Sequence, residues 1–99
     1  MPQPHLPESL EVRVLAHAGA MRVEVLGRLD VATAPRLARA LAALPSGGEV
    51  VVDLAGVTLL DTSGAAVLLR ARHGRNLVVV HPDRNVRRVL DISGVSVRD

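Results

Sequence analysis

The chain has 99 residues, of which 48% are hydrophobic, and it contains no cysteine and no aromatic residue. This length suits one small domain with a single core, and the missing cysteines exclude disulfides, thiolate nucleophiles and thiolate metal sites. A formal charge of only +2, with no aromatic side chain for bases to stack on, argues against a nucleic-acid partner.

Residues 1–9 contain three prolines and little periodic apolarity, so we predict a flexible N-terminal tail followed by a domain over residues 10–99. Apolar and polar residues alternate over residues 10–15 and again over 21–29, which is the period of strands with one face in solvent. The short link over residues 16–20 predicts that these two strands form an antiparallel hairpin.

A helix is predicted after Asp30, because Pro35 suits a first turn in which a missing N–H does no harm. The run Pro-Ser-Gly-Gly at residues 45–48 ends this helix. Residues 49–54 (Glu-Val-Val-Val-Asp-Leu) are apolar through their centre. That pattern is typical of a parallel strand in the middle of a sheet, covered by helices on at least one side.

The polar tetrad Asp-Thr-Ser-Gly at residues 61–64 comes next, and a second helix is predicted over residues 63–73, ended by Gly74. Residues 77–81 are predicted to form another buried strand. The segment between this strand and the preceding one is long enough for one crossover helix, which predicts a right-handed parallel βαβ unit.

A third helix is predicted after Pro82 and Asp83, with its end at Gly94. Residues 95–97 (Val-Ser-Val) are a candidate for a last edge strand. The sequence therefore predicts an α/β domain with a mixed sheet of four or five strands, an N-terminal antiparallel hairpin and at least three helices packed on the sheet.

Ser63 is the candidate functional residue, because it lies where a buried strand passes into the start of a helix. Ligands and modifications of open α/β sheets gather at such carboxyl ends. Asp61 or Thr62 is placed to cap the first turn, and Gly64 is expected to keep the surface beside Ser63 bare for another protein. A phosphoryl group on Ser63 would meet the positive end of the helix, an interaction worth about 0.3–1 kcal/mol.

Each of these residues also has a purely structural interpretation, which the sequence leaves open. Ser63 and Asp61 could be ordinary cap residues, and Asp30 could merely close the turn before the first helix. Thr62 is an alternative phosphate acceptor. The apolar surface around Val67 could pack on a neighbouring helix or be offered to a partner.

The sequence predicts no catalytic residue, no metal site and no cofactor. A nucleophile elbow needs a glycine two residues before the serine, where this chain has Asp61. The four histidines lack the spacing of metal ligands, and without lysine there is no phosphate-binding loop. We therefore expect that the protein is not an enzyme.

A resemblance to a known family rests on segments that occur in a fixed order: residues 25–30 (Val-Leu-Gly-Arg-Leu-Asp), Pro35, residues 50–54 (Val-Val-Val-Asp-Leu), residues 60–64 (Leu-Asp-Thr-Ser-Gly), and residues 77–80 with 89–90. Over residues 10–97 the chain resembles the STAS domain, in particular the bacterial anti-sigma-factor antagonists. The resemblance implies a STAS-like fold and a partner-switching role.

In such a role the unphosphorylated domain binds an anti-sigma factor serine kinase, which frees a sigma factor. The kinase then uses ATP to phosphorylate the domain and end the complex. The phospho-acceptor of the family falls on Ser63. The likeness also assigns the partner-binding surface to Asp30, Asp61, Thr62, Gly64 and the start of the second helix, where we include Val67.

Two other functions stay open, namely an accessory STAS subunit of a membrane transporter and a scaffold in a stress-signalling assembly. No apolar stretch approaches the roughly 20 residues of a membrane span, so we expect a cytoplasmic protein without direct membrane insertion. A homodimer is a further possibility, because the edge at residues 95–97 could pair with a second copy.

Overall fold

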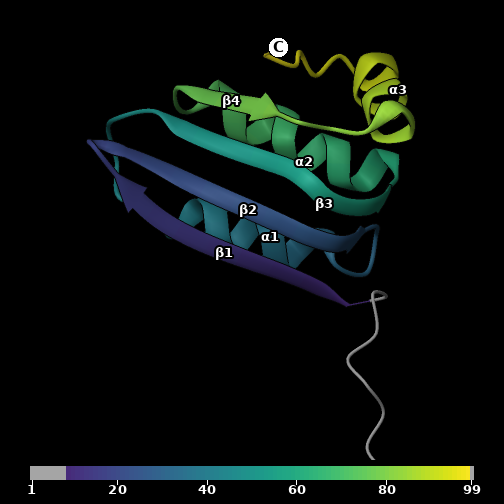
Figure 1. Cartoon of the computed structure of the whole chain (residues 1–99), viewed down its shortest axis with the longest axis horizontal. Helices are drawn as coiled ribbons and strands as arrows, with labels where there is room; N and C mark the ends of the chain where they lie inside the picture. The colour runs from purple at the N-terminus through teal and green to yellow at the C-terminus, as the bar shows by residue number, and fades with distance from the viewer. Residues whose placement is uncertain (1–8, 99) are drawn as a thin grey trace, which may run out of the picture.

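The computed structural model describes residues 9–98, which fold around a four-stranded sheet with the strand order β1-β2-β3-β4 (Figure 1). The strands are β1 (Leu10–His17), β2 (Ala20–Leu29), β3 (Val50–Leu60) and β4 (Leu77–Val80). β1 and β2 are antiparallel, whereas β3 runs parallel to both of its neighbours, β2 and β4. The predicted mixed sheet with an N-terminal hairpin is confirmed. Of the predicted tail, residues 1–8 lie outside the described residues, as does residue 99.

Ala18 and Gly19 alone connect β1 to β2, so the link is shorter than the predicted one over residues 16–20. Both residues have positive φ, 50° and 82°. A type I′ turn requires this conformation, and it matches the twist of the two strands that it joins. The tight turn lets β1 run on to His17, past the predicted end of the strand.

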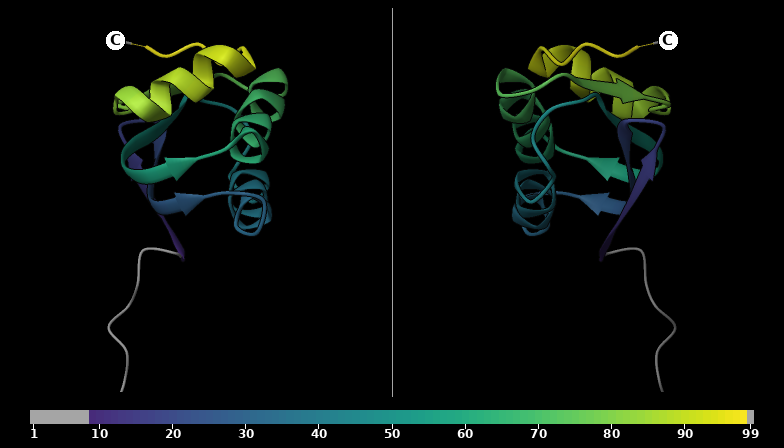
Figure 2. Two further views of the ribbon diagram at one scale, coloured as in Figure 1. Left: turned by 90° about the vertical axis from the view of Figure 1, so that its right-hand side faces the viewer. Right: turned by 90° about the vertical axis from the view of Figure 1, so that its left-hand side faces the viewer.

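Three helices belong to the described part of the chain: α1 (Ala34–Ala42), α2 (Thr62–His73) and α3 (Arg84–Ser93). α1 and α2 lie side by side on one face of the sheet, and α3 packs against α2 and β3 (Figure 2). Among residues 9–98 no helix has both the length and the apolar composition to cross a membrane.

The ends of the helices follow the local signals in the sequence. Pro35 lies in the first turn of α1. The Asp83 side chain accepts a hydrogen bond from the Val86 amide at 2.8 Å and so caps α3. Gly94 ends α3 in the left-handed conformation, with φ of 83°. The predicted start of α1 and both predicted ends of α3 are therefore confirmed, whereas α1 already ends at Ala42, before the run at residues 45–48.

The core between the sheet and the helices is aliphatic. In β3, Val50, Val52 and Leu54 are buried, while the intervening Val51 and Asp53 are half-buried on the opposite face. The largest fully buried side chains include Leu10, Leu29, Leu37, Leu54, Leu68 and Leu90. β3 lies between β2 and β4, as predicted for the strand in the middle of the sheet.

β3 is longer than predicted, because it continues from Leu54 to Leu60 instead of giving way to a loop. Its second half pairs with the end of β2, where Leu29 lies opposite Leu60. The pairing has irregularities after Glu24 and again after Gly27. At Gly56 the strands approach closely, since a Cβ there would lie 2.9 Å from Cγ of Leu26. Contacts with β2 thus carry the strand through Ala55 and Gly56, which are weak strand formers.

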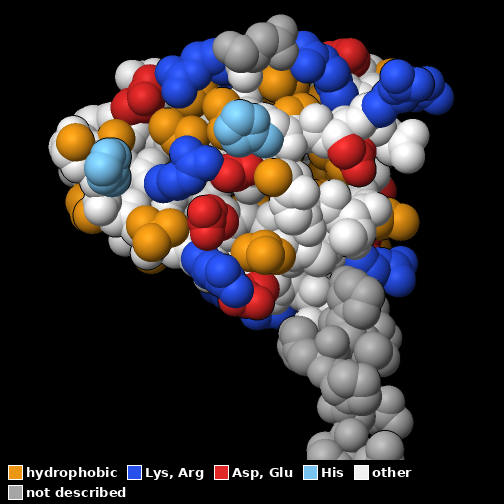
Figure 3. All heavy atoms as spheres, in the orientation of Figure 1, with side chains coloured by type: hydrophobic (Ala, Val, Ile, Leu, Met, Phe, Trp, Pro, Cys, Tyr) orange, Lys and Arg blue, Asp and Glu red, His pale blue; other side chains and the backbone are white. Residues whose placement is uncertain are grey.

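The face of the sheet turned away from α1 and α2 carries charged side chains between apolar ones (Figure 3). Arg22 of β2 donates a hydrogen bond to Asp53 of β3 at 2.5 Å and lies 3.8 Å from Glu24. These partly exposed ion pairs add little to stability. They keep this side of β2 and β3 polar.

The predicted edge strand over residues 95–97 is wrong for the described residues. The Val95 side chain is only 2% exposed and its amide bonds to the carbonyl oxygen of Leu90, which closes the end of α3. One bond joins the following segment to β4, from the Arg98 amide to the Val79 carbonyl oxygen at 2.8 Å. The chain therefore packs along β4 without forming a strand.

Candidate functional site

The predicted site lies where β2 and β3 end and where α2 begins. The Asp61 amide donates a hydrogen bond to the Leu29 carbonyl oxygen at 3.2 Å, so the ends of the two strands are side by side. Asp30 directly follows β2 and Asp61 directly follows β3. The structure thus brings the turn before α1 and the turn before α2 together at one end of the sheet.

Asp61 is the N-cap of α2. Its Oδ1 atom accepts hydrogen bonds from the Ser63 amide at 2.9 Å and from the Gly64 amide at 3.2 Å. The Ala65 amide bonds to the Asp61 carbonyl oxygen at 3.1 Å. Three amides of the first turn are therefore satisfied by one residue. Of the two predicted caps, Asp61 fills this role, and Thr62 is the exposed first residue of the helix.

Ser63 is half-buried in the first turn of α2. Its amide is bound by Asp61, but within residues 9–98 its hydroxyl makes no hydrogen bond. The hydroxyl is therefore not sealed in the core and is not needed to hold the turn together. Its place in the first turn exposes it to the positive end of the helix dipole.

Ser63 lines a groove between the starts of α1 and α2, with a volume of about 560 Å³. The floor and sides are mainly small or apolar residues, including Pro35, Ala66 and Val67, and Thr62 lies at the rim. Val67 is only 9% exposed, so it offers a narrow apolar strip and not a large patch.

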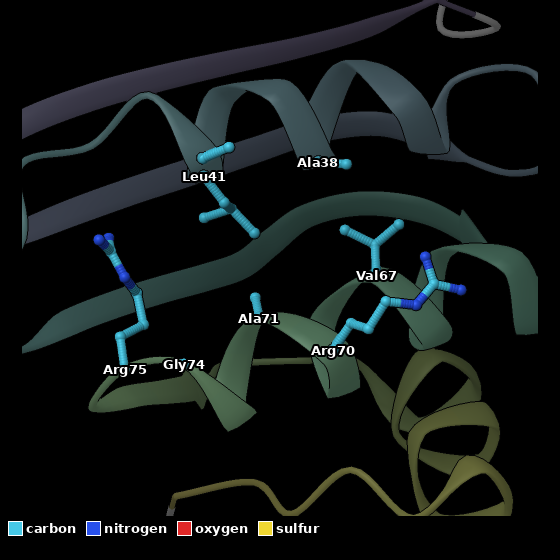
Figure 4. Close-up of a pocket in the computed structure, with 8 residues that line it drawn as sticks. Ala38, Leu41, Val67, Arg70, Ala71, Gly74 and Arg75 are labelled. Atoms are coloured by element: carbon cyan, nitrogen blue, oxygen red, sulfur yellow. The ribbon is translucent and has the colours of Figure 1, made fainter.

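The groove continues between α1 and α2 into a second hollow of about 330 Å³ (Figure 4). Leu41, Val67 and Ala71 supply apolar walls, and the side chains of Arg70 and Arg75 stand toward opposite ends. Arg70 runs back toward Val67, as expected for a helical side chain that tilts toward the N-terminus. We call both hollows together the α1–α2 groove.

Asp30 closes the turn before α1. Its Oδ1 atom accepts hydrogen bonds from the amides of Ala32 at 3.0 Å and Thr33 at 3.2 Å. The buried Thr33 hydroxyl in turn accepts from the Asp30 amide and donates to the Arg28 carbonyl oxygen at 2.8 Å. Asp30 Oδ2 lies 3.8 Å from Nε of Arg28. Asp30 therefore has the structural role of closing the turn before α1, and its carboxylate is half-buried.

The expectation that Gly64 keeps the surface beside Ser63 bare is wrong. This residue is buried, and it does not form bare surface beside Ser63. A Cβ at this position would lie 2.6 Å from Cγ of Leu29 and 2.8 Å from Cδ1 of Leu60. Glycine is required here because α2 starts in direct contact with the ends of β2 and β3.

Val31 and Arg70 also line the groove, although no sequence pattern had marked them as candidate site residues. Val31 is 71% exposed at the rim, and Arg70 is exposed on α2. The positions of Ser63, Val67 and Arg70 follow the i, i+4, i+7 spacing of one helix face, which could have identified Arg70. Val31 follows Asp30 in a turn, where no periodicity marks it.

No group of three or more side chains that could hold a metal ion occurs among the residues that the structure describes. The groove contains one exposed hydroxyl at Thr62, one half-buried hydroxyl at Ser63 and guanidinium groups. Chemically, it can accept a covalent group on a hydroxyl, contact apolar side chains and pair with carboxylates.

Comparison with known proteins gives consistent matches. Residues 12–97 match the family described as "Mlab, STAS domain". The chain is 30% identical over 94 residues to the anti-sigma-B factor antagonist of Staphylococcus epidermidis, with 88% of this chain and 87% of that protein covered.

Solved structures of anti-sigma factor antagonists are also similar to this chain. An anti-sigma factor antagonist from Mycobacterium paratuberculosis superposes with a TM-score of 0.82 at 29% identity, covering 90% of this chain and 81% of that chain. The unphosphorylated form of the anti-sigma factor antagonist SpoIIAA gives a TM-score of 0.67 at 19% identity, covering 86% and 82%. The latter likeness concerns the fold alone.

Proposed function

Because the chain belongs to the STAS domain family, we propose that it is an anti-sigma-factor antagonist that binds an anti-sigma factor serine kinase in the cytoplasm. It binds the kinase while Ser63 carries no phosphate and is released when Ser63 is phosphorylated. In this role the chain is a substrate of the kinase and not itself an enzyme.

The observation that carries the proposal is the position of Ser63 in the first turn of α2. Its hydroxyl is partly accessible, lines the α1–α2 groove and makes no hydrogen bond within residues 9–98. A kinase can bind and phosphorylate such a hydroxyl without breaking a hydrogen bond of the folded chain. Thr62 is more exposed, but the resemblance of residues 60–64 to the family's motif implies Ser63 as the acceptor.

Phosphorylation changes the charge of the docking surface far more than it changes the fold. A phosphoserine carries about −1.5 to −2 charges, which the helix dipole favours by about 0.3–1 kcal/mol. If a carboxylate of the kinase lies about 6 Å away, at an effective dielectric constant of about 20, the repulsion is about 5 kcal/mol. This corresponds to a loss of affinity of more than about a thousandfold.

The test combines the purified chain with the anti-sigma kinase and ATP, and follows the intact mass and the affinity of the complex. We expect one added phosphate on Ser63 and a weakened complex. The Ser63→Ala variant should bind the kinase and stay unmodified, and Ser63→Asp should lose binding. The matched control is Thr62→Ala, which should still be phosphorylated.

Equal phosphorylation of Ser63→Ala would refute the assignment of the acceptor. A phosphorylated chain that binds the kinase as tightly as before would refute the switch. Co-purification with a membrane ATPase subunit, in place of a soluble kinase, would favour the accessory role in a transporter. Phosphorylation by a kinase that the chain does not regulate would favour the scaffold.

A further inference from the structure

The outer edge of β1 is unpaired in the described structure. β1 is the first strand of the sheet order β1-β2-β3-β4, and its eight residues pair only with β2. It contains no proline and no lysine, and its register with β2 is regular along its whole length. Proline, lysine and β-bulges are among the features that protect an edge strand from pairing, and of the protective features β1 keeps only the charged side chains of Glu11 and Arg13.

The hairpin determines which backbone groups of β1 face outward. The two-residue turn makes His17 and Ala20 a hydrogen-bonded pair, and such pairs then alternate along the strands. The odd-numbered residues of β1, such as Glu11 and Arg13, therefore bond to β2. The N–H and C=O groups of even-numbered residues, such as Val12 and Val14, point to the free edge.

The side chains of β1 carry a short charge pattern. Glu11 and Arg13 lie on the same face and form an ion pair with 2.7 Å between Nε and Oε2, with both side chains about half exposed. Val14 and Leu15 are each 46% exposed. The edge thus offers apolar surface next to one negative and one positive charge.

We propose that two copies of this chain pair antiparallel through β1, with Val12 of each copy opposite Val12 of the other. In this register Glu11 of each copy faces Arg13 of the second copy, so both cross-strand pairs are attractive. Leu10 faces Val14 on the other side of the sheet. The two sheets then join into one continuous sheet of eight strands.

Neighbouring registers are less favourable. If the two-fold axis between the copies passed through residue 11, the two Glu11 side chains would face each other. If it passed through residue 13, the two Arg13 side chains would face each other. Like charges directly opposite one another destabilise a strand pair. A two-fold axis through Val14 removes both Glu11–Arg13 pairs, because Arg13 then faces Leu15 and Glu11 faces His17. Because odd-numbered residues form the closer, non-hydrogen-bonded pairs across the new edge, these charges decide the register.

The first experiment measures dimerisation of the full chain and of two charge variants by sedimentation equilibrium. Glu11→Arg places only positive charges at both positions, and Arg13→Glu places only negative charges there. Each variant alone should dimerise at least about tenfold more weakly than the wild type, which corresponds to about 1.4 kcal/mol. An equimolar mixture should restore a dimer, because opposite charges then face each other.

The double variant Glu11→Arg with Arg13→Glu is the matched control. It keeps the ion pair within each chain and the two pairs between chains, so it should dimerise like the wild type. Circular dichroism checks that each variant is folded. A wild type that stays monomeric at all accessible concentrations would overturn the proposal. A dimer that neither single variant weakens would place the interface elsewhere and would also overturn it.

The second experiment tests the register by disulfide formation, since the chain has no cysteine of its own. In the proposed register the two Val12 Cα atoms are about 5.5 Å apart, within the range that a disulfide spans. The two Val14 residues are offset by about 14 Å along the strands. Val12→Cys should cross-link on oxidation and Val14→Cys should not. The reverse result would refute this register.

Discussion

Replacing Gly64 with alanine tests whether the start of α2 is positioned by packing inside the chain. A Cβ at this position would lie 2.6 Å from Cγ of Leu29 and 2.9 Å from its carbonyl oxygen. Leu29 is fully buried and cannot swing away. Overpacking of this kind costs about 1–3 kcal/mol, whereas the helix propensity of alanine returns at most about 1 kcal/mol. We therefore expect the free energy of unfolding to fall by about 1–2 kcal/mol.

The matched control is Gly74→Ala at the other end of α2. No atom lies within 4 Å of a Cβ at this position, and φ is −103°, which alanine adopts without strain. Urea unfolding followed by far-ultraviolet circular dichroism is the suitable assay, because the chain has no Trp or Tyr to report by fluorescence. The melting temperature of Gly64→Ala should fall by about 4–8 °C for each kcal/mol lost. A Gly64→Ala variant as stable as Gly74→Ala would refute this reasoning.

Three further substitutions test the turns around the site. Asp61→Ala should cost about 0.5–2 kcal/mol and speed hydrogen exchange at the Ser63 and Gly64 amides; unchanged exchange would mean that the carboxylate does not hold the helix start. Thr33→Val keeps the shape but removes a buried hydroxyl that bonds on both sides, so urea unfolding should show a loss of about 1–3 kcal/mol. Gly94→Ala should lower stability by about 1–2 kcal/mol because its φ is 83°; an unchanged melting temperature would contradict this.

Local signals predicted most of the fold correctly. Alternation of apolar residues identified β1 and β2, and the short link between them identified the hairpin. Pro35, Asp83 and Gly94 marked helix ends because each acts through its own backbone or its immediate neighbours. Such features need no knowledge of the rest of the chain, which is why the sequence alone is sufficient for them.

Features that depend on distant parts of the chain were missed. The second half of β3 contains Ala55 and Gly56, which do not favour strands, and only pairing with β2 makes it extended. The role of Gly64 depends on Leu29, which is remote in sequence but in contact. Val95 was predicted to start a strand from its composition, yet its burial against the core takes it out of the sheet.

The stability of the start of α2 and the proposed phosphorylation switch at Ser63 depend on different groups. Asp61 and Gly64 set the start of α2 through bonds and contacts that do not involve the Ser63 side chain. Substitutions of the Ser63 side chain should therefore change the free energy of unfolding by no more than about 0.5 kcal/mol, as at surface positions away from special contacts. If Ser63→Asp loses kinase binding while its urea midpoint is unchanged, the loss is caused by the negative charge in the α1–α2 groove and not by unfolding. If Ser63→Asp instead unfolded the chain, phosphorylation would act by melting α2, and a purely electrostatic release would be wrong.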